Sequence, residues 1–123
     1  MKPRATPRIT ATRVGGVLTF VVMGLVGFLP LFGGFGYEHS LATGFLLPSL
    51  TTVSVAWGIA RGAAASTPSL AVLFGLRTAI RFSALAALTA LLHGLRVGFC
   101  SFAEDFTFFL LSPVPGVVLA GAW

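Results

Sequence analysis

At 123 residues the chain is long enough for one small domain, and 56% of its residues are hydrophobic while only 9% are charged. Soluble domains are about a quarter charged, so eight basic and three acidic residues are too few to cover a protein surface in water. The composition therefore excludes a water-soluble globular protein. It predicts an all-α helical bundle in a membrane, with the lipid bilayer as its main partner.

The net charge of +5 does not indicate nucleic-acid binding. Half of the basic residues lie in the N-terminal tail, 1–13: Lys2, Arg4, Arg8 and Arg13. No basic patch is interleaved with base-stacking aromatic residues, and the twelve Phe lie in apolar segments. We therefore expect no nucleic-acid partner. The single cysteine, Cys100, excludes an intrachain disulfide.

An apolar run of 22 residues, 14–35, follows this basic tail. The run is longer than the hydrophobic core of a signal peptide, and no small-residue cleavage site follows it, so we predict a retained membrane span. A helix needs roughly 20 residues to cross the ~30 Å hydrocarbon core of a bilayer. The tail itself is predicted to lie in the cytoplasm.

The second predicted span covers 41–60. The polar break before it, 37–40, is short, so the first two helices must run antiparallel to one another. Pro48 lies inside the second span and is expected to kink the helix. The small residues of 61–67 predict a loop, and Thr67 followed by Pro68 is typical of a helix start.

From Pro68 the pattern stays helical to about Phe99, which is longer than one crossing requires. Placing Arg77 and Arg81 at mid-depth in the bilayer would cost about 2.5–3.5 kcal/mol for each. We therefore place the third span at 82–99. Residues 68–81 are expected to lie at the interface or to extend the helix out of the bilayer.

The fourth predicted span covers 106–123 and contains the sequence SPVPG at 112–116, so we expect it to be bent or broken near its middle. Such a break requires protein or water to satisfy the freed backbone groups. Three crossings are the alternative to four, with a proline-containing run that enters the membrane without crossing it. The apolar ending at Trp123 favours the chain being the N-terminal part of a longer protein.

Four crossings sort the charged residues by side of the membrane. One side would carry seven basic residues: Lys2, Arg4, Arg8, Arg13, Arg61, Arg77 and Arg81. The other side would carry all three acids: Glu38, Glu104 and Asp105. Because Lys and Arg in short loops favour the cytoplasm, both termini are predicted to be cytoplasmic, in a plasma membrane and specifically a bacterial inner membrane. Arg96, near the outer end of the third span, is the exception.

The sequence offers one candidate polar site, at the outer mouth of the predicted bundle. His93, Arg96 and Cys100 are spaced i, i+3 and i+7, so they share a helix face. Four further candidates come from the two outer turns: Glu38, His39, Glu104 and Asp105. As a functional site, the cluster would hold an anionic group at Arg96, with His93 or Glu38 as a proton carrier.

Two other interpretations of this cluster stay open. A metal site would use Glu38, His39, His93 and Cys100. These ligand types suit zinc, but their spacing matches no standard zinc site, and we predict neither a metal nor a cofactor. The structural alternative is an ion pair of Arg96 with Glu104 or Asp105 that fixes the third span against the fourth. His93 would then be a hydrogen-bonded packing residue.

Three functions are consistent with these patterns. A non-catalytic membrane module (an anchor, scaffold or assembly subunit) needs only packed spans and a fixed orientation. A transporter or channel component is the alternative, favoured by the proline breaks. It would act with other membrane subunits or as a homo-oligomer, because four short spans make a poor pore. An enzyme is the least favoured, since the sequence contains no recognised catalytic motif.

Small residues recur at close-packing spacing in the third and fourth predicted spans. They are Ser83, Ala86, Ala87, Ala90, Gly116 and Ala120. In a bilayer such residues let helix backbones approach closely. We expect them to pack helices within the chain rather than to form a dimer face.

Overall fold

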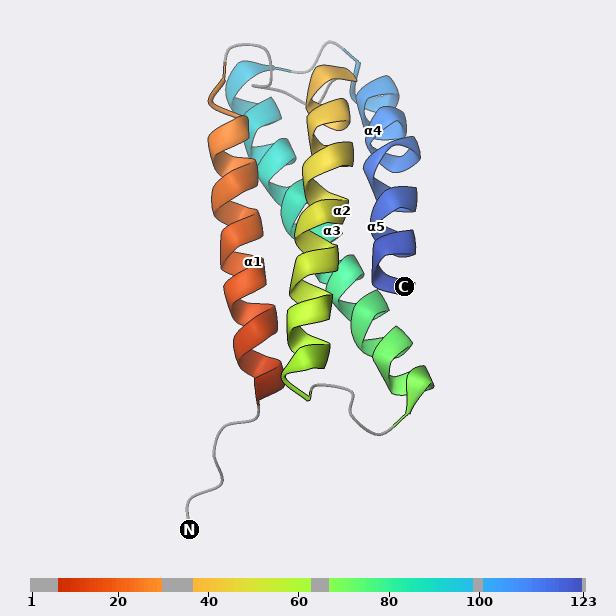
Figure 1. The fold of residues 1–123 in the computed structure, drawn as a ribbon. Helices are drawn as coiled ribbons and strands as arrows, with labels where there is room; N and C mark the ends of the chain where they lie inside the picture. The colour runs from red at the N-terminus through yellow and green to blue at the C-terminus, as the bar shows by residue number, and fades with distance from the viewer. Residues whose placement is uncertain (1–6, 30–36, 63–66, 99–100, 123) are drawn as a thin grey trace.

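A computed structural model describes residues 7–29, 37–62, 67–98 and 101–122. This part of the chain forms five helices and contains no strand (Figure 1). The helices are α1 (Pro7–Val26), α2 (Tyr37–Ala60), α3 (Pro68–Val97), α4 (Phe102–Leu111) and α5 (Pro113–Ala122). The prediction of an all-α protein is therefore confirmed.

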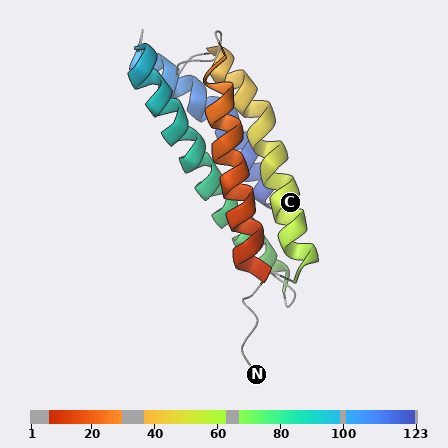
Figure 2. The ribbon, with the colours of Figure 1, turned by 90° about the vertical axis from the view of Figure 1, so that its left-hand side faces the viewer.

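The helices form a bundle of four rods, because α4 and α5 follow one another in a single rod (Figures 1 and 2). Successive rods alternate in direction, so α1 and α3 run parallel to each other and antiparallel to the other two. α5 packs against both α2 and α3, and α1 packs against the same two helices. The core of the bundle therefore lies along α2 and α3.

The alternating rods separate the charged residues by end of the bundle. The end where α1 and α3 begin is here named the basic end. The charged residues of this half of the bundle, within the described part of the chain, are Arg8, Arg13 and Arg61, with Arg77 and Arg81 in the first half of α3. The opposite end, where α2 and α4 begin, is named the acidic end, and its charged residues are Glu38, Arg96, Glu104 and Asp105. This segregation agrees with the sorting that the sequence predicts.

Three segments are long and apolar enough to cross a membrane: α2, α3 and the combined rod from Phe102 to Ala122. The described apolar part of α1, Thr12–Val26, is shorter. The first predicted span, 14–35, is described only as far as residue 29, and its last six residues lie outside the described part of the chain. The fold is thus a membrane-type helical bundle.

Two helices differ in extent from the predicted spans. α1 begins at Pro7, seven residues before the predicted start of the first span, and includes half of the basic tail. Proline suits this first helical position because its missing N–H has no helical partner there anyway.

α3 is one continuous helix of 30 residues, so 68–81 extends the third span. Thr67 is its N-cap residue, with extended φ and ψ, although its hydroxyl makes no capping hydrogen bond.

The interior of the bundle is built from small and polar side chains around a narrow apolar core. Buried hydroxyl groups donate to carbonyl oxygens of the preceding helical turn, as Thr19 does to Gly15 O at 2.8 Å and Thr51 to Leu47 O at 2.8 Å. The large apolar side chains point outward instead; Phe45 is 76% exposed and Leu119 is 71% exposed. This inverted distribution is unfavourable in water and favourable in lipid, where close packing of small residues drives helix association.

The closest approach of two helices lies toward the basic end, where α3 crosses α5. A Cβ added at Gly75 would overlap the carbonyl oxygen of Gly121, and one at Gly121 would come within 2.7 Å of Gly75 O. One turn earlier in α5, Gly116 packs against Pro48 of α2. Glycine is therefore required at this crossing because the two backbones are in contact.

The proline residues inside the second and fourth predicted spans have different effects on their helices. α2 is continuous from Tyr37 to Ala60 with Pro48 inside it. The fourth rod instead divides at Ser112, which ends α4, and Pro113, which begins α5. The Ser112 hydroxyl donates to the carbonyl oxygen of Ser40 in α2 at 3.2 Å. The break predicted at 112–116 is therefore present and is held against α2.

Candidate functional site

At the acidic end, two side chains of α3 bind the C-terminal end of α1. His93, which is only 8% exposed, places Nε2 3.0 Å from the carbonyl oxygen of Gly24. Since a carbonyl only accepts, Nε2 carries the proton in this bond. One turn further along α3, the Arg96 guanidinium donates to the carbonyl oxygen of Gly27 at 3.1 Å.

These two bonds complete the hydrogen bonding at the end of α1. The final carbonyls of a helix have no partner within the helix. Backbone N–H groups of the closing turns, at residues 27–29, satisfy three of them: Met23, Leu25 and Val26. The carbonyl of Gly24 and that of Gly27 are the ones that His93 and Arg96 reach. A guanidinium at this position also interacts favourably with the negative end of the helix dipole.

Phe28 completes the same cluster from the chain that follows α1. Its ring meets the His93 imidazole edge to face, with centroids 5.0 Å apart, and the Arg96 guanidinium carbon lies 4.8 Å from its centroid. Gly27 is needed beside them because a Cβ there would overlap the imidazole ring. We name His93, Arg96, Gly27 and Phe28 the α1-end cluster.

The other candidate residues do not join this cluster. Glu38 and Glu104 are exposed in the first turns of α2 and α4, and Asp105 is half-buried beside Glu104. Between the described residues, Arg96 forms no ion pair with Glu104 or Asp105; its hydrogen bond goes to α1 instead. The hydrogen bond of Arg96 therefore joins α3 to α1 and not to the fourth rod.

His39 and Cys100 complete the predicted set. His39 is buried in the first turn of α2, where its carbonyl accepts a hydrogen bond from Thr43 at 2.7 Å. Cys100 lies outside the described residues. Among the residues that are described, no three His, Cys, Asp or Glu side chains gather closely enough to hold a metal ion. A metal site that includes Cys100 stays an untested prediction.

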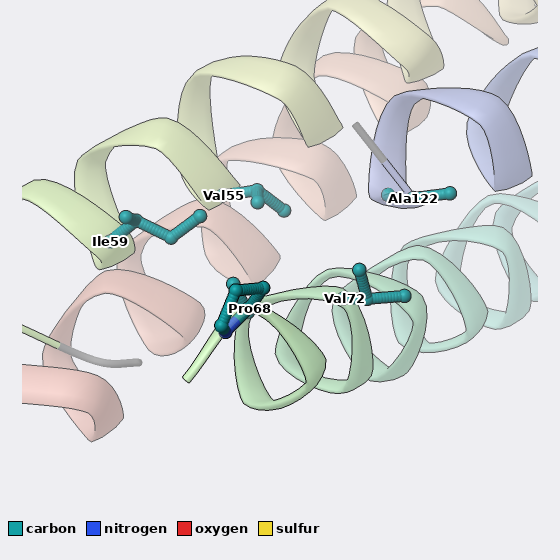
Figure 3. A pocket seen from close by; sticks show the side chains of 7 residues that line it. Val55, Ile59, Pro68, Val72 and Ala122 are labelled. Atoms are coloured by element: carbon teal, nitrogen blue, oxygen red, sulfur yellow. The ribbon is translucent and has the colours of Figure 1, made fainter. Parts of the chain in front are cut away.

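The hollows at the two ends of the bundle are lined by few described side chains that could take part in acid–base or metal chemistry. A surface hollow of about 470 Å³ lies at the acidic end, and the described residues that line it all belong to α4, including Glu104 and Thr107. A smaller pocket of about 180 Å³ lies toward the basic end (Figure 3), where α2, α3 and α5 meet. Its lining is apolar throughout, with Val55, Ile59 and Val72 among the side chains, so it offers no group for acid–base or metal chemistry.

Sequence reasoning did not identify the carbonyls of Gly24 and Gly27 as the partners of His93 and Arg96. The charge pattern suggests oppositely charged side chains as partners of His93 and Arg96. Their actual partners are backbone carbonyls, which every residue carries. The available signal was Gly27, directly after α1, since a Cβ there would overlap the imidazole ring of His93.

No family model matches the chain, and no curated protein and no solved structure is similar to it. The class of protein therefore follows from the fold alone: a four-rod α-helical bundle of the membrane-embedded type.

Proposed function

We propose that the chain is a non-catalytic membrane module, an anchor, scaffold or assembly subunit, that crosses the bilayer four times with both termini in the cytoplasm. The α1-end cluster is the observation that carries this proposal. The most reactive groups of the candidate site, His93 and Arg96, are engaged in hydrogen bonds that fix α1 against α3. A group used in this way contributes to the shape of the bundle rather than to chemistry.

The orientation follows from the charges at the two ends. The basic end, with Arg13 and Arg61, faces the cytoplasm, because Lys and Arg near membrane spans are retained on that side. Arg61 makes a cation–π contact with Trp57 at 5.4 Å, and an amphipathic ring at this end agrees with a membrane interface there. The acidic end then faces the outside of a plasma membrane, in the manner of a bacterial inner-membrane protein.

A transport role is the second candidate, and the division of the fourth rod favours it. Interrupted helices often line the binding sites of transporters. Beside this break, the buried Ser40 hydroxyl has no hydrogen-bond partner among the described residues. A polar group of this kind could bind a solute or a proton that moves past α4 and α5.

Proton flux distinguishes the two candidates. The purified protein is placed in liposomes that contain a pH-sensitive dye, and a potassium gradient with valinomycin drives proton entry. For a non-catalytic module we expect the same rate of internal acidification as in protein-free liposomes. Faster acidification that Ser40→Ala abolishes, in a variant that stays folded, would contradict the module and support the transporter.

A further inference from the structure

A groove of about 380 Å³ lies between α1 and α3 toward the basic end, on the outer surface of the bundle. Its walls are Thr12 and Gly16 from α1 and Arg81, Ala84, Leu85 and Leu88 from α3. The ring of Phe82, which is fully buried, forms its floor. Among the described residues of this lining, Arg81 is the only charged one, and the others are apolar except for Thr12.

The polar and apolar parts of the groove are separated along its length. Arg81 directly precedes the predicted third span, 82–99, whereas Leu88 lies two helical turns, or about 10 Å, further into that span and toward the acidic end. An occupant must therefore present an anionic group at Arg81 and a hydrocarbon chain along Leu85 and Leu88. A phospholipid has this arrangement, and its direction in the groove matches a headgroup at the membrane surface.

The charges around the groove favour an anionic headgroup over a zwitterionic one. Arg13 follows Thr12 in α1, and Arg77 lies one turn from Arg81 in α3, so all described charges at this end are positive. The described acids lie at the opposite end of the bundle, too far away to pair with Arg81. A basic pocket between spans on the cytoplasmic side is typical of anionic-lipid recognition.

We propose that this groove, here named the α1–α3 groove, binds one anionic phospholipid of the cytoplasmic leaflet, with its phosphate at Arg81 and an acyl chain along Leu85 and Leu88. The proposal goes beyond the module function and rests on the membrane location and the orientation proposed with it. Lipid binding would hold α1 against α3 at the basic end, as the α1-end cluster does at the acidic end.

Native mass spectrometry tests the proposal on the full chain released from nanodiscs of equal phosphatidylglycerol and phosphatidylcholine. We expect one phosphatidylglycerol to be retained in preference to phosphatidylcholine, and Arg81→Gln to weaken its retention about fivefold, the effect of one interfacial arginine. Arg61→Gln is the matched control: it removes a charge from the same end but outside the groove, and should leave retention unchanged.

A second variant tests the apolar part of the groove without changing the charge. A Cβ at Gly16 meets only ordinary contacts, the nearest being Leu85 at 3.6 Å, so Gly16→Leu fills the groove from its α1 wall. We expect it to abolish lipid retention. Three outcomes would each overturn the proposal. The first is an equal loss of lipid retention for Arg81→Gln and Arg61→Gln, and the second is equal retention of both lipids. The third is a protein dimer that Gly16→Leu dissociates. Lipid retention is measured independently of proton flux. The lipid-binding proposal and the proposed module function can therefore fail separately.

Discussion

The carbonyl groups of Gly24 and Gly27 show why α1 needs side chains from another helix. In hydrocarbon no water is present to bond a free carbonyl, and each one left unpaired costs several kcal/mol. The turn at residues 27–29 satisfies its neighbours with backbone N–H groups. His93 and Arg96 satisfy the remaining two, so the α1-end cluster has a structural role that does not require a ligand.

Replacing Arg96 tests this role at a single residue. Arg96→Met keeps a long apolar stem but removes the donor to Gly27 O and the charge beside Phe28. We expect the free energy of unfolding to fall by about 1–2 kcal/mol, measured by thermal unfolding in detergent. The same change at the exposed Arg61, whose described side-chain contact is the half-buried Trp57 ring, should cost less than about 1 kcal/mol. Equal losses at the two positions would contradict the assigned role.

At the scale of the helix, α3 and its crossing with α5 show which features the sequence predicts. The length of α3, its start at Pro68 and the break at 112–116 are local properties that propensity and proline chemistry determine. The partner of Gly75 is not local. Each of the fifteen glycines is equally small, and only the three-dimensional arrangement shows that Gly75 and Gly121 are in contact.

The candidate site shows the same limit. Spacing along one helix correctly places His93 and Arg96 one turn apart, and it identifies them as the notable polar pair. It also groups them with Glu104 and Asp105, because those residues lie at the same end of the bundle. The structure assigns the pair to α1 instead, since α1 runs beside α3 and the carbonyls of Gly24 and Gly27 lie within hydrogen-bonding distance of the two side chains.

Two glycine substitutions test the crossing of α3 and α5. Gly75→Ala places a Cβ against the backbone of Gly121, which cannot move as a side chain can, and we expect a loss of about 1–3 kcal/mol of stability. Gly24→Ala is the control, because nothing lies within 4 Å of its added Cβ. Alanine is the better helix former there, so this variant should gain up to about 1 kcal/mol. Thermal unfolding in the same detergent measures both, and a stabilised Gly75→Ala would contradict the close contact.

For the whole molecule, the open question is the number of crossings, and α1 decides it. Its described apolar part, Thr12–Val26, extends only about 22 Å at 1.5 Å per residue, less than the ~30 Å hydrocarbon core. However, α1 is packed along α3: Gly15 touches Phe82, and Gly24 is bonded to His93. These contacts cover most of the length of the predicted third span. If α3 crosses the bilayer, α1 lies at the same depths and crosses beside it.

Cysteine labelling measures this topology directly, in cells that carry the Cys100→Ser chain. A maleimide that cannot cross membranes should label Glu38→Cys in intact cells, but Lys2→Cys and Arg61→Cys only after the membrane is permeabilised. If α1 did not cross, Lys2→Cys would react from the outside together with Glu38→Cys, and three crossings would replace four. Labelling of Arg61→Cys alone in intact cells would instead reverse the orientation and place the basic end outside, against the tendency of arginine to stay in the cytoplasm.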